Sequence, residues 1–324
     1  MKIFINGISG FLGKNLAFGL STVSNSKIIG LDVNELDFGI DVERNNIDFI
    51  KGSFINLIDL KKIDTADVFV HVARTIPPGL ANNEYKRDIK ENLMGTINLF
   101  EHAVKCGSKK FIFISSGGTV YGSDPEPRSY SEAVDKTSHV ESEMCFPVGM
   151  YGLSMYTIER YLKFIADKSS VKLIILRLSN PFGPFQHLNR GQGFVNVLLE
   201  NHIFNRPTEI WGSGLAVRDY IYSGDVVDAI NKSIIYKGRK TIFNIGSGKG
   251  ISINKVVSDV ENLIGEELNI IRKPEKEIKV SKNILNVDLA KSEMNWQCST
   301  DWINGIEKTY VYYKSKYLKS QIVS

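Results

Sequence analysis

Several short, nearly continuous apolar runs constrain the fold of this 324-residue chain more than any other feature. The runs DVFVHVA (residues 67–73) and KKFIFISS (residues 109–116) contain so few polar residues that strands formed by them are expected to be buried on both faces. Other strands are expected at residues 2–7, 27–33 and 172–178, and helices at residues 13–20, 92–105 and 151–166. Strand and helix therefore alternate, and this order predicts an α/β fold with a Rossmann-type, doubly wound parallel sheet.

The first predicted strand runs directly into a glycine-rich loop, NGISGFLG. Gly7, Gly10 and Gly13 have the spacing GxxGxxG, and the loop ends where the first predicted helix begins. Such a turn brings backbone N–H groups and a helix N-terminus close to a bound pyrophosphate. Asp32, at the end of the second strand, can accept hydrogen bonds from adenosine ribose hydroxyls and would repel a 2′-phosphate. The loop and Asp32 together predict a dinucleotide site that favours NAD over NADP.

Composition and short motifs argue against several other classes of protein. The chain carries 40 basic and 36 acidic residues, a net charge of +4, without a basic block dense enough to indicate nucleic acid. Its five histidines and three cysteines show no metal-ligand spacing, and no serine lies in a GxSxG hydrolase motif. No apolar run approaches the ~18 residues of a membrane span. These features favour a cytoplasmic protein that uses no metal and binds neither nucleic acid nor membrane.

Hydroxyl-bearing residues lie at the end of the strand expected at residues 109–116, where an α/β sheet opens its ligand crevice. Ser115, Ser116 and Thr119 belong to the segment FISSGGTVYG. Tyr151 begins a later predicted helix, and Met155 follows one turn further on the same face. The segment 123–149 lacks periodicity and is expected to be a long loop that shapes substrate choice.

These motifs occur in an order that resembles the extended short-chain dehydrogenase/reductases. The resemblance is to the NAD-dependent nucleotide-sugar epimerases and dehydratases typified by UDP-glucose 4-epimerase, and it runs from Lys2 to about Trp296. The motifs that carry it are GISGFLG, HVA, ENLMGTINLFEHAV, SSGGTVYG, YGLSM, RLSNPFGP, GQGF, IWGSG, VRDYIY and FNIGSG. So many motifs in one order are specific for the family and much less specific for the substrate.

The resemblance implies a cofactor site and a substrate site. For NAD it implies Gly7, Gly10, Phe11, Leu12, Gly13, Asp32, Val33, Ser53, Phe54, Val72, Ala73, Arg74, Asn92, Ser115, Tyr151 and Met155. For a nucleotide-diphosphate sugar linked to UDP or dTDP it implies Thr75, Thr119, Asn180, Gln192, Trp211 and Arg218. Tyr151 is the implied acid–base group at the sugar 4-hydroxyl, assisted by Thr119 or Ser116. The family also implies a homodimer, with residues 92–105 and 151–166 as candidate interface helices.

Four positions depart from the family pattern. Gly117 stands where Ser or Thr is common, the acidic residue that the family commonly has near Ser53, by the adenine, is absent, and Arg74 replaces a small residue. Most important, Met155 replaces the lysine of the YxxxK motif. A lysine would lower the tyrosine pKa from its reference value near 10 by ~1–3 units, whereas a thioether is neutral. Tyr151 is therefore expected to stay protonated at neutral pH and to donate a proton better than it removes one.

The expected reaction is epimerisation at C4 of the sugar through a 4-keto intermediate. One alternative is a keto-sugar reductase that uses Tyr151 only as a proton donor. The other is a nucleotide-sugar or NAD-binding protein without turnover, in which Met155 only packs against the sheet. We expect residues 1–179 to form the NAD-binding domain. Residues 180–324 should form mainly the sugar-binding lobe, because strand patterns at 208–211 and 241–245 recur there among loops, with some segments returning to the first domain.

Overall fold

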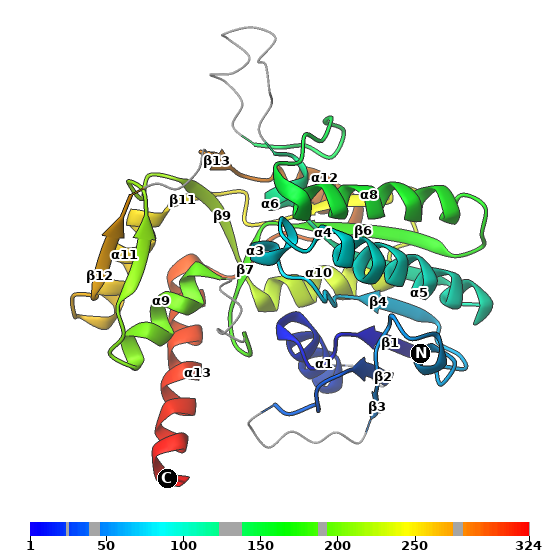
Figure 1. Ribbon diagram of the computed structural model, residues 1–324, viewed down its shortest axis with the longest axis horizontal. Coiled ribbons are helices and arrows are strands. Elements are labelled where there is room, and N and C mark those ends of the chain that lie inside the picture. Colours follow the sequence, from blue (N-terminus) through cyan, green and yellow to red (C-terminus); the bar gives the residue numbers. More distant parts are fainter. Residues whose placement is uncertain (24–25, 39–45, 123–137, 187–192, 275–280, 324) are drawn as a thin grey trace, which may run out of the picture.

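The computed structural model describes residues 1–23, 26–38, 46–122, 138–186, 193–274 and 281–323. Its elements in chain order are β1 (Lys2–Asn6), α1 (Phe11–Val23), β2 (Lys27–Asp32), β3 (Ile47–Lys51), α2 (Leu57–Leu60), β4 (Val68–His71), α3 (Pro78–Ala81), α4 (Tyr85–Asp88), the π-helix η1 (Ile89–Leu93), α5 (Met94–Lys105), β5 (Lys110–Ser116), α6 (Gly117–Val120), α8 (Gly149–Ala166), β6 (Lys172–Leu178), β7 (Asn180–Phe182), α9 (Phe194–Ile203), β8 (Thr208–Trp211), β9 (Val217–Tyr222), α10 (Ser223–Ile235), β10 (Ile242–Ile245), β11 (Gly250–Ser252), α11 (Ile253–Ile264), β12 (Ile270–Lys273), β13 (Lys282–Asn283), α12 (Asp288–Met294) and α13 (Trp302–Val323). Figure 1 shows a helix-covered sheet with α9, α11 and α13 grouped to one side of it.

A seven-stranded parallel sheet in the order β10-β6-β5-β4-β1-β2-β3 forms the centre of the molecule. This order confirms the predicted Rossmann-type, doubly wound fold. Successive strands are added outward on one side from β1 to β3 and then on the other side from β4, so the strand order reverses between β1 and β4. Ligands of such folds bind outside the carboxyl ends of the strands at this reversal. The topology therefore locates the candidate site before any side chain is considered.

Strands β3 and β10 differ from the sequence-based expectation. β3 was not predicted, because IDFIK at the sheet edge has a short, partly exposed pattern rather than a continuous apolar run. The strand expected at residues 241–245 within the lobe is β10, which pairs with β6 and returns the chain to the first sheet. The domain division at residue 179 stays a prediction.

The core lies on both faces of the central sheet. Neighbouring strand residues Phe69 and Val70 have no exposed surface, which agrees with the continuous apolar pattern of β4. Phe69 belongs to a cluster with Leu99 of α5 and Ile158 of α8, whereas Val70 belongs to a cluster with Leu16 of α1. A third cluster joins α9, α11 and α13 around the small sheets of β7, β9, β11 and β13 and of β8 and β12.

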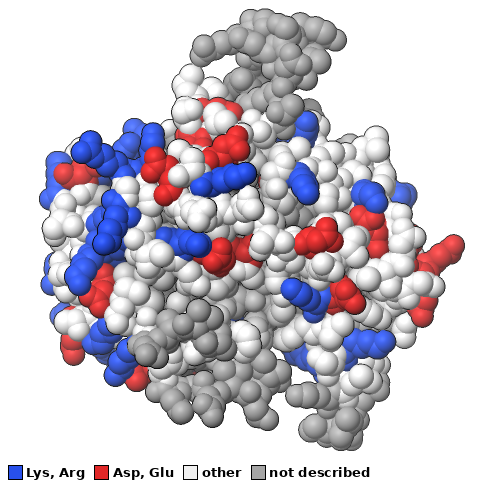
Figure 2. Space-filling view, turned by 180° about the vertical axis from the view of Figure 1, so that it is seen from behind, with Lys and Arg blue, Asp and Glu red and all other residues white. Residues whose placement is uncertain are grey.

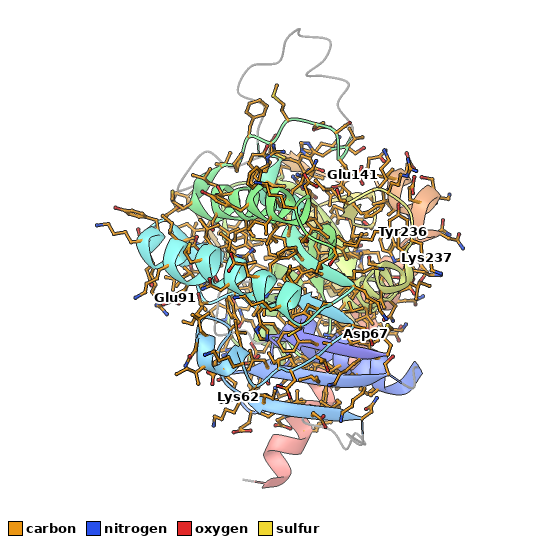
Figure 3. The ribbon with its side chains drawn as sticks, turned by 90° about the vertical axis from the view of Figure 1, so that its right-hand side faces the viewer. Lys62, Asp67, Glu91, Glu141, Tyr236 and Lys237 are labelled. Carbon is orange, nitrogen blue, oxygen red and sulfur yellow. The ribbon has the colours of Figure 1, made fainter. Side chains whose placement is uncertain are left out.

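Asp67 joins the amino-terminal ends of neighbouring strands, at the edge opposite the candidate site. Its carboxylate accepts a hydrogen bond from Lys2 N (2.9 Å) at the start of β1 and pairs with Lys109 Nζ (3.0 Å) just before β5. These bonds lower the pKa of Asp67, with the backbone bond from Lys2 as the largest cause. Figure 3 labels Asp67 at this edge. The contacts help to fix the strand register while leaving the carboxyl ends open.

Charged side chains of both signs share the surface. Figure 2 shows Lys and Arg interspersed with Asp and Glu on the face turned away in Figure 1. Exposed pairs such as Lys27–Asp48 and Lys51–Glu35, both at 2.8 Å, are typical. Each such pair contributes about 0–1 kcal/mol, so burial in the core dominates stability.

The loop expected at residues 123–149 is only partly covered by the structure. Residues 123–137 lie outside the described residues. Residues 138–148 contain no helix or named strand, and two isolated bridges join Phe146 to Gly122 and His139 to Leu285. The chain then enters α8 at Gly149, two residues before the predicted start at Tyr151.

Candidate active site

The glycine loop between β1 and α1 folds back on itself. Gly7 N donates to Leu31 O (2.8 Å) and Gly10 N donates to Gly7 O (3.0 Å). Gly7 has φ +87°, and a Cβ built there would lie 2.8 Å from Ala73 Cβ. A Cβ on Gly13 would lie 2.0 Å from Gly7 O. Only glycine fits at these points, and the three glycines line a cavity at the N-terminus of α1, where a pyrophosphate would bind.

One cavity of about 790 Å³ brings most of the predicted residues together. Its lining includes Gly7, Gly10, Phe11, Leu12, Gly13, Asp32, Val33, Ser53, Phe54, Val72, Ala73, Arg74, Thr75, Ser115, Ser116, Thr119, Tyr151, Met155 and Asn180. Its size is typical of a cleft for a small organic ligand. The glycine cradle and this lining fit a dinucleotide.

The carboxylate of Asp32 is held at the end of β2. It accepts hydrogen bonds from Ser9 N (3.0 Å) and Asn34 N (3.0 Å), which tie the glycine loop to the segment after β2. Asp32 and Val33 both line the cavity. A fixed negative charge at this point suits ribose hydroxyl donors and disfavours a phosphate.

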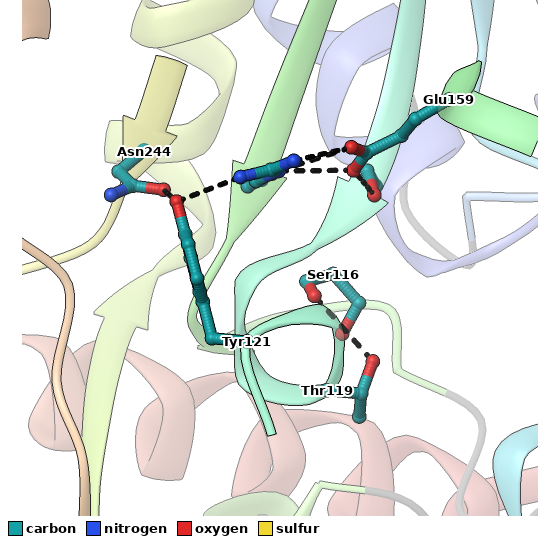
Figure 4. A network of polar contacts seen from close by, with 7 residues as sticks. Ser116, Thr119, Tyr121, Glu159 and Asn244 are labelled. Atoms are coloured by element: carbon teal, nitrogen blue, oxygen red, sulfur yellow. Dashed lines mark hydrogen bonds and ion pairs between the residues drawn. The ribbon is translucent and has the colours of Figure 1, made fainter. Parts of the chain in front are cut away.

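Close packing of α6 on α8 brings Tyr151 and Thr119 to the same wall. A Cβ on Gly152 would lie 2.6 Å from Thr119 O, so the glycine permits the approach. Thr119 Oγ1 makes a long bond to Ser116 O (3.4 Å), shown in Figure 4, and keeps its acceptor capacity for a ligand. Sequence reasoning did not single out Gly152, although a glycine directly after the tyrosine was a usable signal.

The electrostatic surroundings of Tyr151 favour its protonated form. Burial raises the pKa of the phenol above its ordinary value of 10.0, Arg74 lowers it and Asp88 raises it further. The direction agrees with the expectation from the missing lysine at position 155. Tyr151 is therefore a ready proton donor at neutral pH and a weaker base.

A buried polar network supports this wall from behind (Figure 4). Arg177 on β6 donates from Nε (3.1 Å) and Nη2 (2.6 Å) to Glu159 of α8, and from Nη1 to Tyr121 Oη (3.0 Å). Tyr121 donates to Asn244 Oδ1 (2.6 Å), and Ser115 Oγ donates to Glu159. Because breaking a buried pair typically costs ~3–5 kcal/mol, the network fixes α8 on the sheet. Sequence patterns gave no signal for partners so far apart.

The contacts of Asn92 and Arg74 could not be predicted from the motifs in or next to which they lie. Asn92 is buried and lies behind the cavity wall, where its Oδ1 accepts from Thr75 N (2.9 Å) and Thr75 Oγ1 (3.1 Å). It therefore positions Thr75 rather than lining the cavity. Arg74 reaches Met155, and its guanidinium lies 5.2 Å from the centre of the Phe113 ring.

The predicted substrate residues are only partly assembled. Asn180 lines the cavity and donates from Nδ2 to Asp219 O (2.8 Å). Arg218, whose Nη1 donates to Val217 O (2.8 Å), and Trp211, at the end of β8, lie outside the cavity lining. Gln192 lies outside the described residues. The roles of these four residues stay predictions.

Two features are absent from the residues that the structure describes. Among the helices that the structure describes, none is long and apolar enough to cross a membrane. Within the same ranges, no three His, Cys, Asp or Glu side chains gather as a metal site would require.

Comparison with curated proteins identifies relatives that span nearly the whole chain. A dTDP-4-dehydro-6-deoxyglucose reductase of Escherichia coli is 29% identical over 94% of this chain and 95% of its own length. A protein of Methanocaldococcus jannaschii, provisionally described as a UDP-glucose 4-epimerase, is 31% identical over 97% of this chain and 98% of its own.

Comparison with solved structures and family models leads to the same group. The crystal structure of Thermotoga maritima UDP-glucose 4-epimerase with UDP-glucose superimposes with a TM-score of 0.87 at 28% identity, covering 98% of this chain and 100% of that one. Residues 3–246 match the model of the NAD dependent epimerase/dehydratase family, which confirms both the resemblance and the expectation of NAD as cofactor. The chain therefore belongs to the NAD-dependent epimerase/dehydratase family of short-chain dehydrogenase/reductases.

Proposed function

We propose that this chain epimerises a nucleotide-diphosphate sugar at C4. The observation that carries the proposal is a single cavity whose lining extends from the glycine loop, past Asp32, to the hydroxyl groups of Thr119 and Tyr151. One end of this lining suits a pyrophosphate, and the other end suits proton exchange with a sugar hydroxyl. Relatives described as epimerases and as a keto-sugar reductase share this fold and length.

The residues divide the work as follows. The glycine loop holds the pyrophosphate of NAD and Asp32 holds its adenosine ribose, while bound NAD supplies the acceptor and donor of hydride. Tyr151 takes the proton of the sugar 4-hydroxyl and later returns a proton to the 4-keto oxygen. Thr119 or Ser116 assists Tyr151 through a hydrogen bond with the same sugar hydroxyl. Asn180, with Arg218, binds the diphosphate.

A panel of UDP- and dTDP-sugars tests this proposal. Each sugar is incubated with the purified chain and NAD, product configuration is determined by NMR, and NADH absorbance is followed together with it. We expect one sugar to interconvert with its C4 epimer without stoichiometric NADH. Net oxidation or reduction in step with NADH would contradict epimerisation. Binding of sugar and NAD without any product would support a protein that does not turn over.

Keto-sugar reduction is the second candidate, and the environment of Tyr151 favours it. Met155 provides no cation, and burial raises the pKa of the phenol, so proton donation is easier than proton removal. A reductase rate should stay flat through neutral pH, because Tyr151 remains protonated there. An epimerase rate should rise with pH, because its first step needs the deprotonated phenol. The two pH profiles therefore separate the reactions.

Asp32 should set the choice between NAD and NADP. Replacing it by Asn removes the negative charge while keeping an oxygen that can accept from Ser9 N. We expect the preference for NAD over NADP to fall on the order of tenfold, equivalent to ~1.4 kcal/mol. Asp48→Asn on β3, an exposed carboxylate outside the cavity, is the control. Titration of both cofactors by fluorescence measures the ratio, and an unchanged ratio would exclude this role.

The proposal includes a homodimer formed through α5 and α8. Both helices cover the same face of the sheet (Figure 1), and they expose large apolar side chains. On α8 these are Leu153 (46% exposed), Tyr161 (50%) and Phe164 (62%), and on α5 Met94 (48%). Exposed apolar side chains gathered on one surface mark an interaction site. A two-fold axis would pair the two-helix surface of one subunit with the same surface of the other.

Introducing charge on α8 should separate the subunits. In Leu153→Glu/Phe164→Glu the new carboxylates would be desolvated between the two subunits, and the symmetry would bring four of them into one interface. We expect light scattering to give twice the chain mass for the unmodified protein and the single-chain mass for the variant. Leu318→Glu, at an equally exposed position on α13, should leave the mass unchanged. A monomeric unmodified protein would exclude the dimer.

The proposal also includes a cytoplasmic location, which the state of the cysteines supports. Cys106, Cys145 and Cys298 are free thiols. Free thiols of this kind suit a reducing compartment. Cell fractionation tests the assignment, and recovery of the protein from an oxidising compartment would contradict it.

A further inference from the structure

The helix that carries Tyr151 lacks the cation of the family motif. Met155, one turn after Tyr151, is 2% exposed and packs in an apolar cluster with Phe113 and Ile158. Its thioether is neutral. Because ionising a desolvated phenol is costly without a neighbouring positive charge, another source of charge determines how well Tyr151 acts as a base.

Arg74 brings a guanidinium to this place from a different element. It lies in the loop after β4, three residues beyond His71. Its Nη2 contacts Met155 Sδ, and its guanidinium carbon lies 5.2 Å from the centre of the Phe113 ring. Arg74, Met155 and Tyr151 line the same cavity. The guanidinium thus lies at the tip of the side chain that replaces the lysine.

We propose that Arg74 is the positioning residue of Tyr151 and supplies, from the loop after β4, the positive charge that the YxxxK lysine supplies from the helix in the family. The inference rests on the proposed function, in which Tyr151 is the acid–base group. The two departures from the family pattern are complementary. The family pattern has a small residue in the loop and a lysine on the helix, whereas this chain has Arg74 in the loop and Met155 on the helix. The cation is therefore on the loop in place of the helix.

The charges around the pair agree with this role. Arg74 lowers the pKa of Tyr151, and Tyr151 is the first of the acidic groups that raise the pKa of Arg74 against the effect of burial. A guanidinium does not lose its proton in proteins, so its charge persists at the working pH of the enzyme. Stacking over Phe113 compensates part of its desolvation.

Three other titratable groups interact electrostatically with Tyr151 or Arg74. Asp88 of α4 raises the pKa of Tyr151 and is hydrogen-bonded to Asn92 Nδ2 (2.6 Å). Glu159 of α8 acts on Arg74 and is itself paired with Arg177. His71 of β4 is buried, and burial lowers its pKa well below the usual value, so it stays neutral. Among these groups, Arg74 alone carries a positive charge that acts on Tyr151.

A titration of Tyr151 itself tests the inference without substrate or NAD. The residue is replaced by 3,5-difluorotyrosine, whose fluorines lower the phenol pKa and give a ¹⁹F NMR signal that reports ionisation. We expect Arg74→Met to raise the titration midpoint by ~1–3 pH units, the usual effect of losing a close opposite charge. Arg74→Lys should keep the midpoint near that of the unmodified chain. Arg206→Met removes another arginine that stacks on a ring, 5.0 Å from Phe204, outside the cavity lining, and should change nothing.

A double variant moves the cation back to the helix. In Arg74→Ala/Met155→Lys we expect the midpoint to return towards that of the unmodified chain. Arg74→Gln provides a second neutral variant if Arg74→Met does not fold, as judged by circular dichroism. An unchanged midpoint in a folded neutral variant would overturn the inference, whichever reaction the chain catalyses. A sugar panel without turnover would instead overturn the proposed function and leave the titration result standing.

Discussion

Replacing Gly13 by alanine is expected to weaken NAD binding at least on the order of tenfold and to lower the melting temperature. A Cβ at this position would lie 2.0 Å from Gly7 O and 2.7 Å from Ile8 Cα, and backbone atoms cannot move aside as side chains do. Relieving such a clash costs typically ~1–3 kcal/mol, and it must open the loop that would hold the pyrophosphate. Calorimetric titration with NAD and a thermal melt measure the two effects.

Gly79→Ala is the matched control for this prediction. A Cβ on Gly79 meets nothing within 4 Å, and its backbone does not have positive φ. The substitution should leave NAD affinity unchanged. If Gly13→Ala also bound NAD normally, the close packing of the loop on α1 would not be what shapes the cofactor site.

Replacing Tyr151 by phenylalanine is expected to reduce kcat by ~10²- to 10⁴-fold, the usual contribution of a positioned acid–base group. The ring would still pack against the apolar cluster below α8, so folding and NAD affinity should be retained. Tyr161→Phe, on an exposed position of the same helix, should leave kcat unchanged. Near-normal turnover of Tyr151→Phe would assign the proton transfer to another group, with Thr119 as the first to examine.

Much of the fold could be predicted because the pattern of neighbouring residues alone indicates a buried strand or an amphipathic helix. Continuous apolar runs identified the buried strands β4 and β5, and the predicted bounds of β6 and β8 match those of the structure. β3 was not predicted because an edge strand needs no continuous apolar run. η1 was not predicted because a π-helix has no sequence period of its own. The place of β10 depended on a long-range pairing with β6 that no local pattern encodes.

The candidate site was predicted where a motif and a strand end coincide. The glycine loop, Asp32, Thr119 and Tyr151 all meet in one cavity, because the carboxyl ends of parallel strands share one edge of the sheet. Arg74 was predicted as an NAD-binding residue and as a departure from the family pattern, but its contact with Met155 was not predicted, since a sequence does not state where a loop side chain reaches. The Glu159–Arg177 pair was missed because its partners come from a helix and a strand with no shared motif.

The fate of the hydrogen on C4 of the sugar tests the central claim most directly. A nucleotide sugar labelled with deuterium at C4 is incubated with the chain and unlabelled NAD, and its epimer is isolated for mass spectrometry. C4 epimerisation returns the same hydride to the same carbon, so the product should keep the deuterium. Loss of the label from an epimerised product, or transfer of hydrogen from added NADH into a reduced product, would contradict the account.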